Sequence, residues 1–264
     1  MSVLDHVADD IVPVAPAKSM GRSREELLRK GQEFTRRVFD FGQRKYHSAL
    51  GYAAAAAPEG VVGGVCGITA RLAFTPENIL LGYAQGMFPM DKRGSITWYC
   101  PDPRCAVPLD KLHIPSRIKT YLRKRTFELH FDRSPAAVLA ACGSRPDTWL
   151  TRRVQDAYLA LFELGAMHTV EAWQGERLVG GLFGVALGSV VTVESMFSLE
   201  DHASKLAFAH LCVHARERGF ALVDCQYQAD HFERFGAIEM PREEYRRRVA
   251  VGLLRAPSFC APKS

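Results

Sequence analysis

The chain of 264 residues lacks any run of about 18 apolar residues that is free of proline, glycine and charge. It also lacks a basic start followed by an apolar segment, because the first residues, "MSVLDHVADDIVPVAP", carry acids instead. The first absence argues against a membrane-spanning helix, and the second argues against a signal peptide. We therefore expect a cytoplasmic protein without a membrane partner.

Paired cysteines are also missing. The 7 cysteines are odd in number, are scattered and include no C-x-x-C pair, so neither a disulfide framework nor a zinc site is indicated. His210 and His214 have a metal-ligand spacing, but no glutamate stands between them and no third ligand accompanies them. We expect reduced thiols and no bound metal.

Strong net charge is absent as well, since the formal value is only +5. The basic residues nevertheless cluster, most clearly in "RIKTYLRKR". Such a cluster is either a solvated helix face or a surface that meets phosphates. The residues concerned are Arg117, Lys119, Arg123, Lys124 and Arg125.

The first half of the chain contains two predicted helices. Residues 1–20 are small, contain proline and predict disorder, and apolar residues at helical spacing then predict a basic helix over about 24–47. A linker follows over 53–64. The second helix begins with Thr75 as N-cap and Pro76 in the first turn, and it stops at Gly86.

The second half predicts an α+β domain. Two helices, "SPAAVLAACGS" and "RRVQDAYLALFELG", precede three strands, "HTVEAW", "RLVGGLFGVAL" and "VVTVESMF". A helix that Gly219 ends, the strand "FALVDCQYQ", a short helix and a last strand follow. This order resembles the GNAT acyltransferase fold, in which two central strands splay apart. A CoA donor needs a glycine-rich loop after the third strand, and the junction "SMFSLEDHASKLAF" contains no glycine.

Polar residues occupy the ends of two apolar strands. Asp224 and Gln226 stand at alternate positions, which predicts that they face the same way. Glu194 follows Val190, Val191, Thr192 and Val193. Because an unpaired buried polar group costs about 1–3 kcal/mol, these residues are either hydrogen-bonded structural groups or parts of a working site.

Several motifs occur together in order, among them "WYCPDPR", "DTWLT", "VESMFS" and "VDCQ" with "DHFERFGAIEMPR". They resemble the leucyl/phenylalanyl-tRNA–protein transferase family over about residues 81–248. The resemblance implies a small N-terminal domain (66–113) and a GNAT-like domain (114–255), here with an N-terminal extension (1–65) and a tail (256–264). It implies transfer of Leu, Phe or, less well, Met from aminoacyl-tRNA to proteins that start with Arg or Lys. No cofactor is implied, because the aminoacyl ester already stores the energy.

The family's functional positions map onto residues of this chain. Asp224 and Gln226 are implied in catalysis, and Glu194 is implied in holding the α-amino group of the aminoacyl ester. Met196 and Phe197 are candidate walls of an apolar amino-acid pocket, with core packing as the alternative.

The same resemblance implies a site for the tRNA 3′ end. Trp98 and Trp149 match family tryptophans, and Trp98 is a candidate to stack on the terminal adenine, with plain packing as the alternative. Ser204 and Lys205 open a helix whose N-terminal amides are suited to a terminal phosphate. The "RIKTYLRKR" cluster is the candidate contact for the tRNA backbone.

The chain departs from the family pattern at several points. Tyr99 and Cys100 replace Trp and Ser, Ala229 replaces Asn, and Val193 replaces a glycine, which predicts a narrower pocket. These departures leave open which amino acid is carried and which acceptor receives it. The alternatives are an enzyme with another amine acceptor, such as a small molecule or peptide natural product, and a non-catalytic tRNA-binding homologue.

Overall fold

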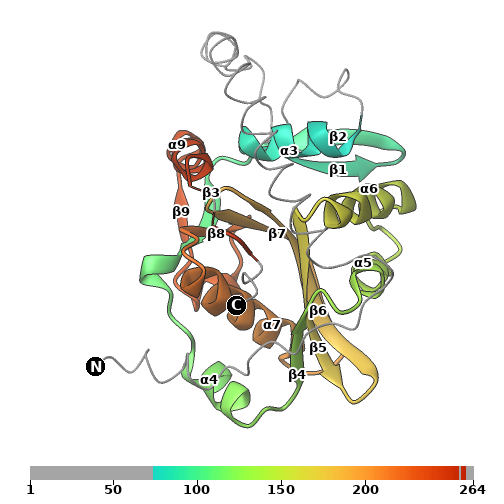
Figure 1. Ribbon diagram of the computed structural model, residues 1–264, viewed down its shortest axis with the longest axis vertical. Coiled ribbons are helices and arrows are strands. Elements are labelled where there is room, and N and C mark those ends of the chain that lie inside the picture. The colour runs from blue at the N-terminus through green and yellow to red at the C-terminus, as the bar shows by residue number, and fades with distance from the viewer. Residues whose placement is uncertain (1–73, 256, 260–264) are drawn as a thin grey trace, which may run out of the picture.

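The computed structural model describes residues 74–255 and 257–259 of the chain (Figure 1). Helix α3 (Pro76–Ala84) precedes a small antiparallel sheet of β1 (Phe88–Lys92) and β2 (Ser95–Tyr99). The disordered start, the basic helix and the linker expected in the first 64 residues lie outside the described residues.

A 7-stranded sheet forms the centre of the described structure, in the order β4-β5-β6-β7-β8-β3-β9. All neighbours are antiparallel except β7 and β8. The strands are β3 (Arg104–Pro108), β4 (Glu128–Phe131), β5 (Met167–Gln174), β6 (Arg177–Leu187), β7 (Val190–Ser198), β8 (Leu222–Gln226) and β9 (Ile238–Met240).

Helices cover both faces of this sheet. Figure 1 shows α7 on one side of β5 and β6, with α5 and α6 on the other. The helices after α3 are η1 (Leu109–Lys111), α4 (Ser116–Arg123), α5 (Pro135–Cys142), α6 (Arg152–Glu163), α7 (Ala203–Glu217), α8 (Asp230–Glu233) and α9 (Arg242–Leu253). Among the described residues, none of these helices is long and apolar enough to cross a membrane.

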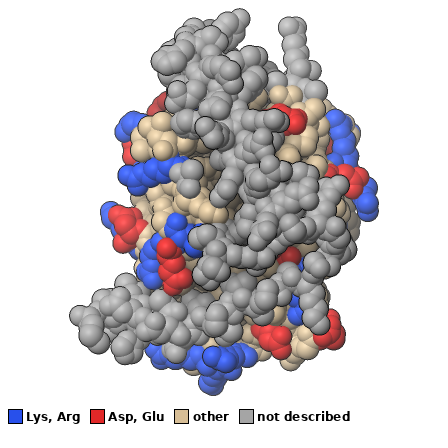
Figure 2. Space-filling model, in the orientation of Figure 1, with Lys and Arg blue, Asp and Glu red and all other residues tan. Residues whose placement is uncertain are grey.

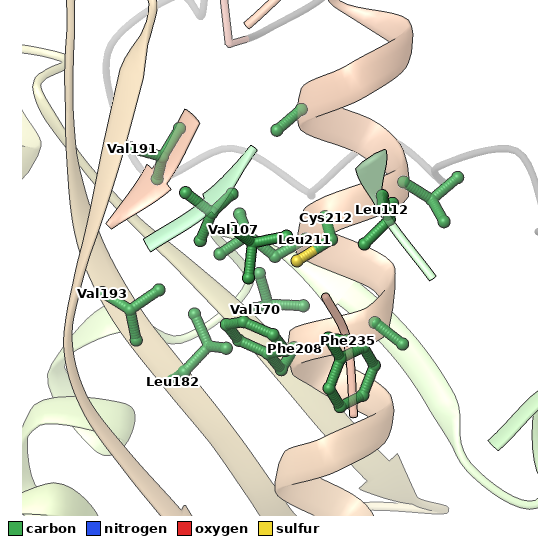
Figure 3. Close-up of a cluster of buried hydrophobic side chains, with 14 of the residues drawn as sticks. Val107, Leu112, Val170, Leu182, Val191, Val193, Phe208, Leu211, Cys212 and Phe235 are labelled. Atoms are coloured by element: carbon green, nitrogen blue, oxygen red, sulfur yellow. The ribbon is translucent and has the colours of Figure 1, made fainter. Parts of the chain in front are cut away.

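The alternation of side chains along the strands builds two main cores, beside two smaller buried clusters among the described residues. Leu182 of β6 joins a cluster with Phe208 of α7 (Figure 3), whereas the next residue, Phe183, packs with Tyr158 of α6 in a second cluster. Helix α7 is buried along most of its length because apolar residues surround it. The two cores hold the central strands from both sides.

The pairing between β7 and β8 is short. It joins Val190 to Leu222, Val191 to Val223 and Thr192 to Asp224, although both strands continue beyond that point. Each strand then carries one extra residue relative to its other neighbour, namely Glu194 opposite β6 and Cys225 opposite β3. Bulges of this kind bend a strand and redirect its side chains.

Most expected elements are present. Thr75 caps α3 by accepting a hydrogen bond from the backbone N–H of Asn78 at 3.4 Å, and Gly86 and Gly219 follow their helices with positive φ angles. The order from β5 to β9 is also as predicted. The sequence patterns missed η1, α4, β4 and α9, and they predicted a turn at Phe88 and Pro89, where strand β1 begins. Strand β3, which falls in the segment expected to be a small N-terminal domain, pairs with β8 and β9 of the large sheet, and the domain boundaries stay a prediction.

The bulge at Glu194 requires a glycine on the facing strand. A Cβ atom at Gly184 would lie 2.5 Å from the carbonyl oxygen of Thr192, closer than real Cβ contacts allow. We therefore expect Gly184→Ala to lower the free energy of unfolding in urea by about 1–3 kcal/mol, the usual cost of overpacking. An unchanged free energy of unfolding in Gly184→Ala would contradict this account.

Candidate active site

Asp224 is fully enclosed near the end of β8, with 0% of its surface exposed. Its Oδ1 accepts hydrogen bonds from Arg104 Nε at 2.8 Å and from the backbone N–H of Gln226 at 2.9 Å. Its Oδ2 accepts from Arg104 Nη2 at 2.5 Å and from the Tyr245 hydroxyl at 2.7 Å. Because four donors occupy the carboxylate, it is built as an anchor rather than as a free proton acceptor.

Gln226 ends β8 in an unusual backbone conformation. Its φ angle is +64°, which residues with a Cβ atom seldom adopt. The extra residue Cys225 interrupts the expected alternation of side chains, so Asp224 and Gln226 do not face the same way. Asp224 faces Arg104 and Tyr245. The Gln226 amide lies close enough to Glu194 to favour the ionised form of the Glu194 carboxyl group. The Nε2 atom of Gln226 is buried and has no hydrogen-bond partner among the described residues.

Glu194 occupies the bulge of β7 and is 7% exposed. Its Oε2 accepts a hydrogen bond from the Tyr158 hydroxyl at 3.2 Å, and that hydroxyl lies 2.6 Å from the hydroxyl of Tyr83. Its Oε1 is buried without a hydrogen-bond partner among the described residues. One carboxylate oxygen is therefore fixed by protein and the other remains available.

Burial raises the pKa of Glu194 to about 7. The nearby Tyr83 hydroxyl and the charge of Arg104 oppose this shift, whereas the charge of Asp224 adds to it. The two carboxylates thus differ in their surroundings, because the Asp224 carboxylate is ion-paired, whereas no described residue forms an ion pair with Glu194. Buried carboxylates with perturbed pKa values are candidates for functional groups.

The sequence of this chain matches two models of one protein family, and the matched ranges include both buried carboxylates of the site. The family model described as leucyl/phenylalanyl-tRNA protein transferase matches residues 106–250, and the model of that family's N-terminal domain matches residues 73–102. The chain belongs to the leucyl/phenylalanyl-tRNA–protein transferase family. The matches include Glu194, Asp224 and Gln226, and they leave residues 1–72 unmatched by either model.

Individual relatives are similar over most of their own length. A leucyl/phenylalanyl-tRNA–protein transferase of Herpetosiphon aurantiacus is 41% identical over 193 residues, which are 73% of this chain and 100% of that protein. One of Nitratidesulfovibrio vulgaris is 47% identical over 65% of this chain and 76% of its own length. One of Salinibacter ruber is 41% identical over 70% of this chain and 83% of its own length.

The residues expected to form the transferase's amino-acid pocket lie around β7. Val193 packs with Leu182 and Phe208 in the core beneath α7 (Figure 3). Met196 is half-buried against that same core, whereas Phe197 is half-buried against the core that contains Tyr83 and Tyr158. The pocket roles of these residues, and the narrowing expected from Val193, stay predictions.

The two tryptophans expected at the tRNA 3′ end differ in their surroundings. Trp98 is 1% exposed and lies so close to Gly82 that a Cβ there would sit 2.2 Å from its ring, so its ring is packed in the core, and stacking on the terminal adenine stays a prediction. Trp149 is half-buried and its ring contacts that of Tyr158, with centroids 6.4 Å apart. Trp149 therefore borders the hydroxyl chain that reaches Glu194.

The transferase's expected phosphate-binding groups lie together at the start of α7. Lys205 is half-buried, and the backbone N–H of Ser204 donates to Ser198 Oγ at 3.1 Å. The rings of Tyr121 in α4 and His202 are 4.8 Å apart, which brings α4 against the start of α7. Figure 2 shows Lys and Arg gathered at the lower edge, where α4 lies in Figure 1.

Four residues of the site were missed by the sequence patterns. Arg104 is the last residue of the motif "WYCPDPR", and a buried aspartate such as Asp224 needs a cationic partner. The motif and this requirement together could have identified Arg104. The other three are Tyr83, Tyr158 and Tyr245, whose positions on their helices predict ordinary core packing. Among the described residues, no group of three or more His, Cys, Asp or Glu side chains is arranged to hold a metal ion.

The raised pKa of Glu194 predicts how stability depends on pH. The folded protein keeps this proton up to about pH 7, whereas the unfolded chain releases it near the ordinary value of 4.5. The contribution of the Glu194 carboxyl group to the free energy of unfolding is therefore fully present below pH 4.5. It is lost as the pH rises through 7, by roughly 3 kcal/mol in total. Glu194→Gln removes this loss, so urea unfolding should show its stability relative to wild type rising from pH 4.5 to 8.

The control for this measurement is Glu176→Gln, which removes a carboxylate whose side chain is 96% exposed. Its stability difference from wild type should stay constant across the same pH range. Parallel pH curves for wild type and Glu194→Gln would show that Glu194 keeps an ordinary affinity for its proton.

Proposed function

We propose that the protein transfers Leu or Phe from aminoacyl-tRNA to the N-terminal α-amine of an acceptor protein. The observation that carries this proposal is the family match over residues 106–250, which spans the buried site of Glu194, Asp224 and Gln226. The relatives from Herpetosiphon aurantiacus and Nitratidesulfovibrio vulgaris are leucyl/phenylalanyl-tRNA–protein transferases. An acceptor that starts with Arg or Lys, and a cytoplasmic location, belong to the same proposal.

The reaction is aminolysis of an ester. The amine nitrogen attacks the carbonyl carbon of the aminoacyl ester, a C–N bond forms, and the C–O bond to the terminal ribose breaks. One proton of the amine passes to the leaving ribose oxygen. A free α-amine has a pKa of about 7.7–8.0, so a sizeable share is already neutral, and the enzyme chiefly has to position the reactants.

The unpartnered atoms of the site supply that positioning. The Glu194 Oε1 atom is the proposed acceptor for the α-ammonium group of the carried amino acid. The buried Nε2 of Gln226 is the proposed donor to the ester carbonyl oxygen, which gains charge in the transition state, while the amide as a whole orients the incoming amine. Asp224 holds Gln226 by its backbone N–H.

The proposed amino-acid pocket is apolar and lies beside β7, with Met196 and Phe197 as walls. An added or missing methylene in such a pocket changes binding by about 1–3 kcal/mol, so Leu, Met and Phe should differ by degree. A GNAT-like arrangement supports this placement, because β7 and β8 stop pairing after Thr192 and Asp224 and leave their ends on either side of the site.

The proposed path of the tRNA runs along α4 to the start of α7. The basic cluster defined above occupies α4 and the turn after it, and Lys205 stands where the terminal phosphate would meet the helix N-terminus. Arg117 lies over the ring of Tyr121, at 6.0 Å, and so faces the same end of α7.

Substitution of Asp224 and Gln226 tests the catalytic proposal. We expect Asp224→Asn and Gln226→Ala each to slow transfer of radiolabelled Leu or Phe to an Arg-starting peptide by about 10²-fold or more, with tRNA binding nearly intact. The double variant should lose less than the product of the two single losses, because the residues act as one unit. Wild-type rates in both single variants from pH 6 to 9 would make the pair structural.

The salt dependence of binding tests the tRNA path. Each phosphate contact should lower log K by roughly 0.7 per tenfold rise in salt if the tRNA end behaves as a single strand. Neutralising Arg123, Lys124 and Arg125 together should therefore flatten the slope. Neutralising Arg247 and Arg248, which are ion-paired with Glu244, is the control. An unchanged slope in the first variant would place the tRNA elsewhere.

A further inference from the structure

Arg104 has surroundings that an ordinary ion pair does not need. Its guanidinium group lies between two aromatic rings, 4.7 Å from the centroid of Phe88 and 4.6 Å from that of Tyr245. The residue is 1% exposed, and two of its nitrogens bind the two oxygens of Asp224. The rings and the carboxylate together fix the plane of the guanidinium group.

The effect of this fixation continues to Gln226. The Asp224 oxygen that accepts from Arg104 Nε also accepts from the backbone N–H of Gln226. That hydrogen bond joins the residue whose φ angle is +64°, a conformation that persists only where its surroundings enforce it. A chain of contacts therefore runs from β3, through the carboxylate, to the backbone of the proposed catalytic amide.

We propose that Arg104 is a positioning residue of the transfer reaction, which holds Gln226 in its left-handed conformation by orienting Asp224. This inference rests on the proposed function and adds to it a residue from another strand. A lysine at this position would keep the positive charge, but it lacks the planar pair of donors that sets the angle of the carboxylate.

The geometry also separates this role from simple stabilisation. Buried ion pairs are weak sources of stability, because the desolvation of two charges offsets their attraction. The Nη1 atom of Arg104 is itself buried without a hydrogen-bond partner among the described residues. The Arg104 side chain thus leaves one nitrogen without a hydrogen bond while it directs two others at Asp224. This arrangement is better explained by a role in orienting the Asp224 carboxylate than by a gain in stability.

The test is the Arg104→Lys variant in the peptide-transfer assay, with kcat and KM for aminoacyl-tRNA measured separately. A misplaced reacting group costs about 10²-fold in rate, so we expect kcat to fall by about that factor. KM should change little, because Arg104 acts through Asp224 and not on bound tRNA. The control is Arg248→Lys, since Arg248 pairs with Glu244 on the exposed face of α9 and should transfer at the wild-type rate.

A second pair of variants tests the route through Asp224. Arg104→Gln combined with Asp224→Asn leaves no unpaired buried charge, so this double variant remains testable where Arg104→Lys fails to fold. If Arg104 works through Asp224, the double variant should have about the kcat of Asp224→Asn alone. Circular dichroism and thermal melts must show both proteins folded at the assay temperature.

The outcomes are distinct. A folded Arg104→Lys variant with wild-type kcat overturns the role of Arg104 and leaves the proposed function standing. A double variant with wild-type kcat, or one whose loss is the product of two independent losses, overturns the route through Asp224. A wild-type protein that transfers no amino acid overturns the proposed function itself, and the role of Arg104 within it.

Discussion

The site depends on one interruption of the sheet, where β7 and β8 stop exchanging backbone hydrogen bonds after Thr192 and Asp224. A regular sheet would have paired Glu194 and Gln226 and filled this position with backbone contacts. The extra residues Glu194 and Cys225 end that pairing while the outer neighbours of both strands stay paired. Polar side chains can therefore stand between two central strands without breaking the sheet.

The polar groups at this interruption are supported from three different helices. Tyr83 of α3 and Tyr158 of α6 form the hydroxyl chain to Glu194, and Tyr245 of α9 donates to Asp224. Each tyrosine buries its ring in a core and directs its hydroxyl to the site. The same side chains thus contribute to folding and to the geometry of the candidate site, which couples the two.

The sequence was sufficient to predict the helices and strands with clear patterns and the family. It also singled out Glu194, Asp224 and Gln226, which the structure buries, as candidate site residues. It did not predict that Cys225 is an extra residue, because a bulge leaves the alternation of apolar and polar residues unchanged in the sequence. It did not predict the partner of Asp224 either, since Arg104 lies 120 residues away and only the β3–β8 pairing brings it close. For Trp98 the sequence left both stacking on a base and plain packing open, because an aromatic residue in a motif gives no sign of whether it is packed.

The unsatisfied oxygen of Glu194 has a consequence for the energetics of ligand binding. With a pKa of about 7, this carboxyl group is about half protonated in neutral solution. A ligand that brings a cationic amino group to it selects the ionised form, so the remaining protons must leave when the complex forms. Binding and proton release are then linked, and the apparent affinity and heat of binding depend on the buffer that accepts the proton.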